Sequence, residues 1–402
     1  MDVVHGFRKI IGLVPCLITS SILAQSLPTA TPDTSDHAAA AARLSQAIEA
    51  ADPKKFLPLL DSAAFRERVL KGLPITPNAR AALGDAINER TLPGFAFGRD
   101  FRSYDFLRLV TRNGRVHAQY RIVIQHKNGH DLQVNYHEWL LVASADRTLK
   151  FVDIYDATSG EYMSQGLRRR YLRLIGEDPS LQEKDAKWLP VDELEIKNLT
   201  KLVEIGGSRE PEIILERIRL LPADLQQTRF VQLHRLRAMA LQVKQKPNAF
   251  DQAYAEWLKL APEDPTFDLQ AYIVWLGTGQ YDRFYAAIDR IERWAGRDAH
   301  LDVIRATAAL LQDKPDAAAQ AEKWAQRALE ADANYLAALR VLMNVQIKQK
   351  KYAQVVTTLQ KVETVTKLTL DVVGIGKDDP ATQQFAESKE YKAYRQDNPL
   401  KN

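Results

Sequence analysis

The sequence predicts an α+β domain, with helices packed on a curved antiparallel sheet, followed by an all-α helical-repeat solenoid. Three observations favour this fold class. The hydrophobic period is helical up to about residue 89, changes to two between residues 105 and 156, and is helical again from about residue 190. The chain has 402 residues, which is enough for more than one domain. Internal similarity in the second helical part recurs at about 34 residues, a period typical of stacked helix pairs.

The composition is that of a globular protein. Hydrophobic residues make up 46% and charged residues 26%, which excludes wholesale disorder and a polytopic membrane protein. Basic residues number 55 and acidic residues 51, so the net charge is only +4. Because nucleic-acid binding requires a strong basic footprint, we expect no nucleic-acid partner.

Residues 1–24 have the features of a secretory signal peptide. A basic start at Arg8-Lys9 precedes an apolar run at 10–23 and the small residue Ala24. The run is shorter than the about 20 residues that span a bilayer. We expect cleavage after Ala24, a disordered tether at 25–36, and a periplasmic or secreted bacterial protein with no transmembrane segment after cleavage. An uncleaved anchor is the alternative.

The single cysteine, Cys16, lies inside this segment. Pro15 stands where a bacterial lipoprotein needs a small residue, so lipidation is not expected. The mature chain then contains no disulfide and no thiolate metal site.

The first domain, 37–176, opens with helices. Apolar residues recur at helical spacing in 38–51. Asp52-Pro53 provides a cap and a first-turn proline for a second helix. A third helix is expected from Thr76-Pro77 to about Glu89.

Four strands are expected next, at 105–111, 116–126, 130–143 and 148–156. Asn113-Gly114 fits a two-residue turn, which places Leu109 opposite Ala118 and Leu107 opposite Tyr120.

The second hairpin offers two registers. A two-residue turn at Asn128-Gly129 places Ile122 opposite Asn135, whereas a three-residue loop at 127–129 pairs apolar residues. We therefore predict the three-residue loop, because a slip of one residue exchanges the two faces of a strand. The predicted apolar face carries Leu107, Leu109, Ala118, Tyr120, Ile122, Ile124, Leu132, Val134, Tyr136, Leu140 and Val142. The opposite face carries His117, Gln119, Arg121, Asn135 and His137.

Two segments of this domain carry a resemblance. Residues 47–61, from Ala47 through Asp52-Pro53 to Asp61, resemble the opening of the nuclear transport factor 2-like superfamily, and 151–155 resembles its last long strand. The resemblance implies the cone fold that this superfamily shares with ketosteroid isomerase, also described as cystatin-like.

Residues 191–366 read as helix pairs, after a turn-rich linker at 177–190. The pairs are expected at about 191–222, 225–261, 265–296, 298–332 and 334–366. Residues 324–334 resemble the end of a tetratricopeptide repeat, with Ala328 followed 34 residues later by Val362. The turns at 279–282 and 350–353 match that family's turn between helices, and Ala253 and Ala321 occupy its small position. Capping helices and a tail are expected at 367–402.

The histidines suggest a metal site only weakly. His126 and His130 flank the second turn as a cross-strand pair, and His117 and His137 are expected diagonally on the polar face. No third ligand has convincing spacing, so we expect an exposed hairpin tip, no metal and no cofactor.

Two carboxylates are weak catalytic candidates. In the predicted register Glu138 falls on the apolar face opposite Ala118, where burial would raise its pKa. The cone fold often lines a pocket with this face, and some relatives use an acidic residue there as a base. Asp153 on the last strand is its possible companion. The alternative is a carboxylate that pairs with lysine or arginine.

A basic cluster at Arg168-Arg169-Arg170 and Arg173 follows the sheet. It has the charge to receive an acidic partner or membrane phosphates, but a solvated helix face explains it more simply.

The sequence therefore favours a binding or scaffold protein without catalysis. Repeat arrays present a concave groove, lined by the first helix of each pair, to peptides or proteins. Candidate groove residues are Arg229, Arg235, Tyr272, Arg305, Arg340 and Asn344. Because several are arginines, we expect an acidic partner. The alternative is a small-molecule-binding or enzymatic cone domain with Glu138 in its pocket.

Overall fold

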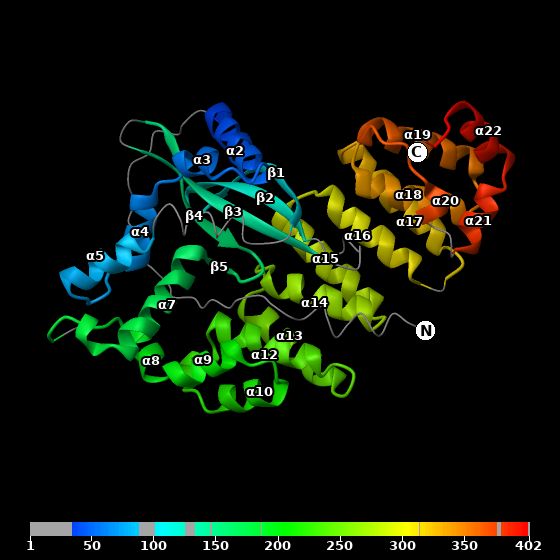
Figure 1. Cartoon of the computed structure of the whole chain (residues 1–402). Coiled ribbons are helices and arrows are strands. Elements are labelled where there is room, and N and C mark those ends of the chain that lie inside the picture. Colours follow the sequence, from blue (N-terminus) through cyan, green and yellow to red (C-terminus); the bar gives the residue numbers. More distant parts are fainter. Residues whose placement is uncertain are drawn as a thin grey trace. The chain divides into compact units, whose positions relative to one another are not determined.

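The computed structural model describes residues 34–87, 101–124, 133–144, 147–185, 187–312, 314–375 and 379–400. The predicted signal peptide and Cys16 lie outside these residues. By its internal contacts the chain divides into two compact units, Met1–Val274 and Trp275–Asn402. The first unit contains the antiparallel sheet and its helices, and the second is entirely helical, so the predicted fold class is confirmed (Figure 1).

The first unit begins with helices at Thr34–Glu49 (α2), Pro53–Phe56 (α3), Ser62–Leu70 (α4) and Pro77–Asp85 (α5), with a short 3₁₀ turn at Leu57–Leu59 (η1). Side chains of Asp52, Asp61 and Thr76 accept hydrogen bonds from backbone N–H groups and so cap α3, α4 and α5. The expected tether is too long by three residues, because residues 34–36 already form the first turn of α2. The third predicted helix ends at Asp85, and Glu89 lies outside the described residues.

The sheet has five antiparallel strands in the order β1-β2-β3-β4-β5. They span Phe101–Arg112 (β1), Arg115–Ile124 (β2), Val134–Ala143 (β3), Leu149–Asp156 (β4) and Glu161–Tyr162 (β5). Sequential strands are neighbours throughout, so the sheet is a meander.

The register of the first hairpin is confirmed up to a bulge. Arg112 pairs with Arg115 and Leu109 with Ala118, as the Asn113-Gly114 turn predicts. A register shift between Phe106 and Arg108 then places Phe106, instead of Leu107, opposite Tyr120. The predicted pairing of Leu107 is therefore wrong.

The predicted register of the second hairpin is wrong by one residue. Ile122 pairs with Asn135 and Tyr120 with His137, which is the register that the two-residue turn gives. Residues 134–141 are all buried, so both faces of β3 are covered and neither is exposed to solvent. The alternation of polar and apolar residues therefore does not mark a solvent face along this strand. Every β3 side chain therefore lies on the face opposite to the predicted one.

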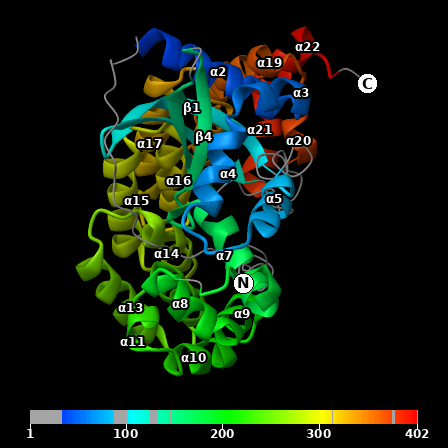
Figure 2. The same cartoon turned by 90° about the vertical axis from the view of Figure 1, so that its left-hand side faces the viewer.

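Large aromatic side chains fill the inner face of this sheet. Tyr104, Tyr120 and Trp139 are at most 2% exposed, and they pack with Phe56 and Phe151. Helix α2 covers them with Ala40, Ala41, Leu44, Ala47 and Ile48 (Figure 2). The Tyr120 hydroxyl donates a hydrogen bond to the Ala41 carbonyl at 2.8 Å. This core holds the sheet and the first helices together.

Helix α7 (Met163–Glu177) follows the sheet and carries the predicted basic cluster. Arg168 is buried and donates to Asp192 of α8 (Pro190–Lys197) at 2.7 Å. Arg169 pairs with Glu161 at 3.1 Å and lies within 4.0 Å of Glu195. For these two arginines the expectation of a solvated face is wrong, because they attach α8 to α7.

The remaining helices follow the predicted pairs closely. The first pair is α8 and α9 (Leu199–Gly207) with α10 (Pro211–Arg219), and α11 (Ala223–Gln226) precedes the next pair. Four regular pairs are α12 (Arg229–Leu241) with α13 (Pro247–Leu260), α14 (Thr266–Gly277) with α15 (Tyr281–Ala295), α16 (Ala299–Leu310) with α17 (Ala317–Ala331), and α18 (Leu336–Lys348) with α19 (Tyr352–Thr366). The second helices begin at 247, 281, 317 and 352, that is 34, 36 and 35 residues apart.

Two turns between helices have the same local structure, as their sequences predict. Gly279 and Lys350 both have a positive φ, of 72° and 58°. The next residue in each turn, Gln280 or Lys351, donates its backbone N–H to the carbonyl five positions earlier. This is the Schellman pattern that ends a helix.

The division into units does not follow the linker predicted at 177–190, because α12 and α14 contact the sheet and its turns within the first unit. Backbone N–H of Val134 donates to the Tyr272 hydroxyl at 3.1 Å, and the Gln270 amide donates to the Thr158 carbonyl at 3.2 Å. Arg229 bonds both the Gly160 carbonyl and Asp264. The division falls between Val274 and Trp275 instead.

The chain closes with three short helices, Val372–Ile375 (α20), Pro380–Ala386 (α21) and Lys389–Asp397 (α22). Phe385, Tyr391 and Tyr394 pack against α18 and α19, as expected for a cap. Within the described residues, no helix combines the length and the apolar character needed to cross a membrane.

Candidate functional site

Glu138 lies in a polar network on the face of the sheet opposite to the aromatic core. It stands opposite Gln119, whose amide donates to it at 3.0 Å. Arg112 donates to the same carboxylate at 2.9 Å, and Arg108 donates to Gln119 at 3.0 Å. The prediction that Glu138 faces Ala118 is wrong, because Trp139 takes that place. The Glu138 carboxylate forms an ion pair with Arg112, which is the alternative to a catalytic role that the sequence offers.

His117 and His137 lie on opposite faces of the sheet, and not together as predicted. His117 Nε2 is 2.8 Å from the Tyr162 hydroxyl, and burial lowers the pKa of this histidine. His137 Nδ1 is 2.9 Å from the hydroxyl of Tyr104. His126 and His130 lie outside the described residues. Elsewhere, the described part of the chain contains no group of three or more His, Cys, Asp or Glu side chains placed to hold a metal.

Asp153 is buried beside a small pocket at the edge of β4. Its carboxylate accepts hydrogen bonds from Arg68 Nε at 2.8 Å, from the Ser164 hydroxyl at 2.5 Å and from the backbone N–H groups of Ser164 and Ile154. Burial raises the pKa of Asp153, against the opposing effects of Arg68 and Ser164. Four donors occupy both oxygens, so this carboxylate is not available as a base.

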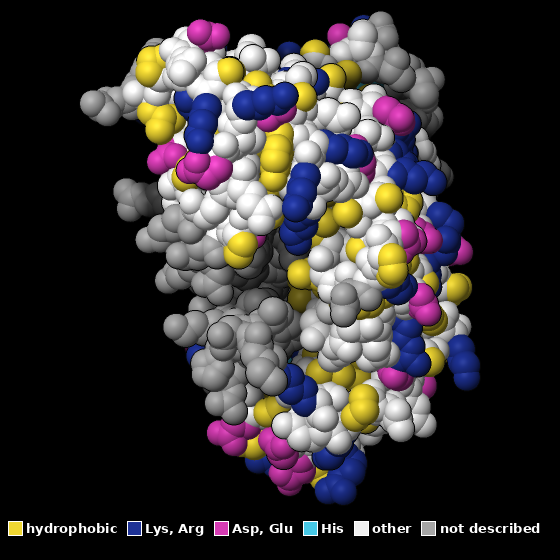
Figure 3. All heavy atoms as spheres, turned by 90° about the vertical axis from the view of Figure 1, so that its right-hand side faces the viewer, with side chains coloured by type: hydrophobic (Ala, Val, Ile, Leu, Met, Phe, Trp, Pro, Cys, Tyr) yellow, Lys and Arg dark blue, Asp and Glu magenta, His cyan; other side chains and the backbone are white. Residues whose placement is uncertain are grey.

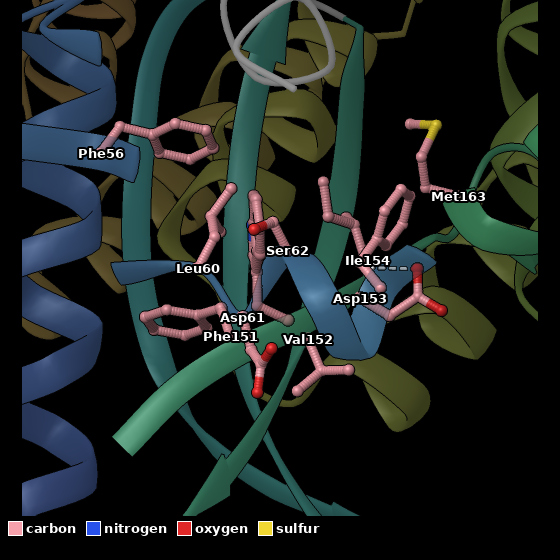
Figure 4. A pocket seen from close by; sticks show the side chains of 11 residues that line it. Phe56, Leu60, Asp61, Ser62, Phe151, Val152, Asp153, Ile154 and Met163 are labelled. Atoms are coloured by element: carbon pink, nitrogen blue, oxygen red, sulfur yellow. Dashed lines mark hydrogen bonds between the residues drawn. The ribbon is translucent and has the colours of Figure 1, made fainter. Parts of the chain in front are cut away.

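The pocket itself is apolar. Phe56, Leu60 and Phe151 line one side, and Asp153 lies on the other side of the lining (Figure 4). The space open to the centre of a water molecule is about 20 Å³, which holds about one water. The two carboxylate candidates, Glu138 and Asp153, both have structural partners.

Three of the predicted groove residues are committed to contacts inside the chain. Tyr272 is fully buried, with its hydroxyl bonded to Val134. Arg229 attaches α12 to the Gly160 turn, and Arg305 is 1% exposed within an ion-pair cluster. For Tyr272 and Arg305 the prediction of an open groove is wrong, because both side chains are buried, whereas Arg229 is partly buried.

The other three residues remain at the surface. Arg235 is half-buried and pairs with Glu256 at 3.1 Å. Arg340 and Asn344 are exposed on α18. Lys348 is exposed four positions further on, so Arg340, Asn344 and Lys348 share one face of the helix. We call these three residues the α18 stripe.

The α18 stripe is the main polar surface among the first helices of the regular pairs. Within α18 the three stripe residues are the exposed ones, whereas α16 exposes no residue, α14 exposes Gly277 and α12 exposes Leu241. Lys348 was not among the predicted residues. Two features of the sequence indicate the stripe. Its residues 340, 344 and 348 are four positions apart, and no Asp or Glu stands between Asp332 and Glu363.

Charges elsewhere on the surface are mixed. On the face shown in Figure 3, dark-blue basic and magenta acidic side chains are interspersed between small hydrophobic areas.

Comparison with known proteins adds no assignment. No protein-family model matches this chain, and neither a curated protein nor a solved structure matches it.

Proposed function

We propose that this chain is an exported protein-binding scaffold that uses the α18 stripe to bind an acidic segment of a partner protein. The observation that carries this proposal is the stripe itself: two cationic side chains and an amide, exposed at four-residue intervals on one helix face. In this proposal the helix pairs form a tetratricopeptide-like array, and the sheet is a cone-like domain that serves as a support.

The chemistry of the stripe favours a carboxylate-bearing partner. An arginine binds a carboxylate with two parallel hydrogen bonds, and a lysine supplies a point charge. Asn344 lies between them and offers both a donor and an acceptor to an extended backbone. The second helix of the pair, α19, exposes only neutral residues, namely Ala353, Gln354, Thr357, Gln360 and Thr364. The exposed side chains of α18 and α19 are therefore neutral or positive, and Asp379 at the start of α21 is a carboxylate on which Lys348 acts.

The aromatic core argues against a ligand pocket in the sheet. Tyr104, Tyr120 and Trp139 occupy the inner face, and their polar atoms are hydrogen bonded. A cone that binds a small molecule needs that volume open.

The test is affinity purification from a periplasmic extract of the native host, with the full chain as bait. Arg340→Glu/Lys348→Glu is compared with Arg293→Glu/Lys323→Glu, which makes the same charge change at exposed positions of the second helices α15 and α17. We expect at least one protein to bind the wild type and the control, and to be lost from the stripe variant and at high salt. A partner that binds both variants equally would place the interface elsewhere.

A further inference from the structure

A cluster of five charged side chains joins three helices of the second unit. Arg305 of α16 donates to Asp289 and Glu292 of α15, both at 2.6 Å, and to Asp302 of its own helix at 2.9 Å. Arg327 of α17 donates to Glu292 at 2.5 Å and lies 3.4 Å from Asp302. Both guanidinium groups also lie over the ring of Trp324, at 5.0 and 5.2 Å from its centroid.

The cluster carries one more negative than positive charge. Three carboxylates face two guanidinium groups. Asp289 has a side chain 55% exposed, so water solvates its charge, whereas Asp302 is fully buried. A charge on Asp302 is costly because the interior solvates a buried carboxylate poorly.

One oxygen of Asp302 is left without a donor. Oδ1 faces both arginines, while Oδ2 is buried and receives no hydrogen bond from any residue that the structure describes. The charged groups that act on Asp302 are Arg327 of α17, Arg305 of its own helix and Glu292 of α15. His300, also on α16, lies 2.7 Å from the hydroxyl of Tyr335, the residue that precedes α18. Tyr285 of α15 acts on Arg305.

We propose that this cluster is a proton-binding switch, in which Asp302 takes up one proton on mild acidification and thereby stabilises the packing of α15, α16 and α17. The proton balances the charges of the cluster at two positive and two negative. Because α18 packs on α16 and α17, the switch acts on the helices that support the α18 stripe. The proposal does not depend on what the stripe binds.

The direction of the effect follows from the shift. Burial is the main cause that raises the pKa of Asp302 to about 6, with a further contribution from Glu292 and against both arginines. An unfolded Asp has a pKa of about 3.9. The folded state therefore binds the proton more tightly than the unfolded state does. Protonation of Asp302 contributes its whole stabilising effect on the folded state below about pH 4, and this contribution is lost as the pH rises through about 6.

The experiment is urea unfolding of the full chain at pH 5 and pH 7, for the wild type and for Asp302→Asn. Between these two pH values Asp302 gains its proton in the folded state (pKa about 6) but stays charged in the unfolded state (pKa about 3.9). We therefore expect its protonation to lower the unfolding equilibrium constant about tenfold when the pH falls from 7 to 5. Asp302→Asn is neutral at both values and lacks that tenfold change. Glu195 and the other shifted carboxylates are common to both proteins and cancel in the ratio.

A second variant keeps the test decisive if Asp302→Asn does not fold. Glu292→Gln removes the neighbouring carboxylate that raises the pKa of Asp302, so it shifts the titration of Asp302 to lower pH and reduces the tenfold change. Asp282→Asn, an exposed carboxylate on the same helix α15 outside the cluster, leaves the change intact. Equal pH dependence in the wild type, Glu292→Gln and Asp282→Asn would overturn the proposal.

Discussion

At the scale of single residues, the hydroxyl of Tyr104 connects two buried polar side chains in the aromatic core. Trp139 Nε1 donates to it at 2.6 Å, and His137 Nδ1 lies 2.9 Å away. Tyr104 is 1% exposed, so water does not replace these partners. The hydroxyl therefore allows polar atoms to lie inside an otherwise apolar layer.

Tyr104→Phe should destabilise the first unit by about 1–3 kcal/mol, because the Trp139 N–H loses a buried hydrogen-bond partner. Tyr120→Phe is the matched control, since its hydroxyl donates a hydrogen bond to the Ala41 carbonyl and its ring packs in the same core. Denaturation followed by circular dichroism measures both. A smaller loss for Tyr104→Phe than for Tyr120→Phe would show that the hydroxyl of Tyr104 is not a shared partner.

The buried pair of Arg168 and Asp192 permits a second test at this scale. Arg168→Leu leaves a carboxylate buried without its cation, and we expect a loss of about 3–5 kcal/mol. Arg173→Leu, in the same basic cluster, removes an exposed pair with Glu177 and should change stability by less than about 1 kcal/mol. Similar unfolding midpoints for the two variants would contradict the role of Arg168 in attaching α8.

Glu138 shows where the sequence misleads at this scale. Alternation was used to choose a register, but β3 is buried on both faces and carries polar side chains on both. Networks such as Arg112–Glu138–Gln119 make a buried polar residue acceptable, and no pattern in one strand reveals its partner on another. The sequence offers the pairing of Glu138 with an arginine as an alternative, but it places Glu138 on the wrong face of the sheet.

At the scale of elements, the turn between β4 and β5 is where the sheet meets the helices of its own unit. Gly160 has a φ of 72°, and an added Cβ there would lie 2.5 Å from Thr266 Oγ1 and 2.6 Å from the Arg229 side chain. The carbonyl of Gly160 accepts a hydrogen bond from Arg229. The close approach of α12 and α14 therefore requires glycine at this position.

Gly160→Ala should destabilise the first unit more than Gly72→Ala does. Both positions have a positive φ, which costs alanine about 1–2 kcal/mol. An added Cβ at Gly72 has no heavy atom within 4 Å, whereas at Gly160 it overlaps two side chains and adds about 1–3 kcal/mol. Urea titrations of the two variants provide the comparison. Equal losses would indicate that this contact is loose.

Elements were predictable where a local rule determines them. Caps at Asp52 and Thr76, the Asn113-Gly114 turn and the turns at Gly279 and Lys350 are all where short-range chemistry places them. The bulge at Leu107 and the attachment of α14 to the sheet were not predictable. They depend on contacts between residues far apart in sequence, such as Tyr272 with Val134.

At the scale of the whole molecule, the chain contains two units whose boundary lies within a continuous helix. A linker rich in turn residues was expected to separate the domains, but Gly176–Ser180 is followed by helices that belong with the sheet. Composition marks where a chain turns, and it does not show which surfaces become buried afterwards.

The same distinction explains the candidate binding residues. Arg305 and Tyr272 lie on first helices of the pairs, as Arg340 and Asn344 do, and one sequence does not fix the helix phase well enough to tell which of them point outward. Only the packed structure distinguishes buried ion pairs from the exposed α18 stripe. Arg340 and Asn344 are exposed on α18, whereas Tyr272 on α14 and Arg305 on α16 are buried.

The central claim, that the α18 stripe binds a partner, is tested most directly by photo-crosslinking in cells. A p-benzoylphenylalanine residue is placed at Asn344, at Gln326 on α17, and at Arg115 in the sheet, all of which are exposed. We predict a crosslinked partner at position 344, lost when Arg340→Glu and Lys348→Glu are added, and none at 326 or 115. Crosslinks at 326 or 115 without one at 344 would contradict the account.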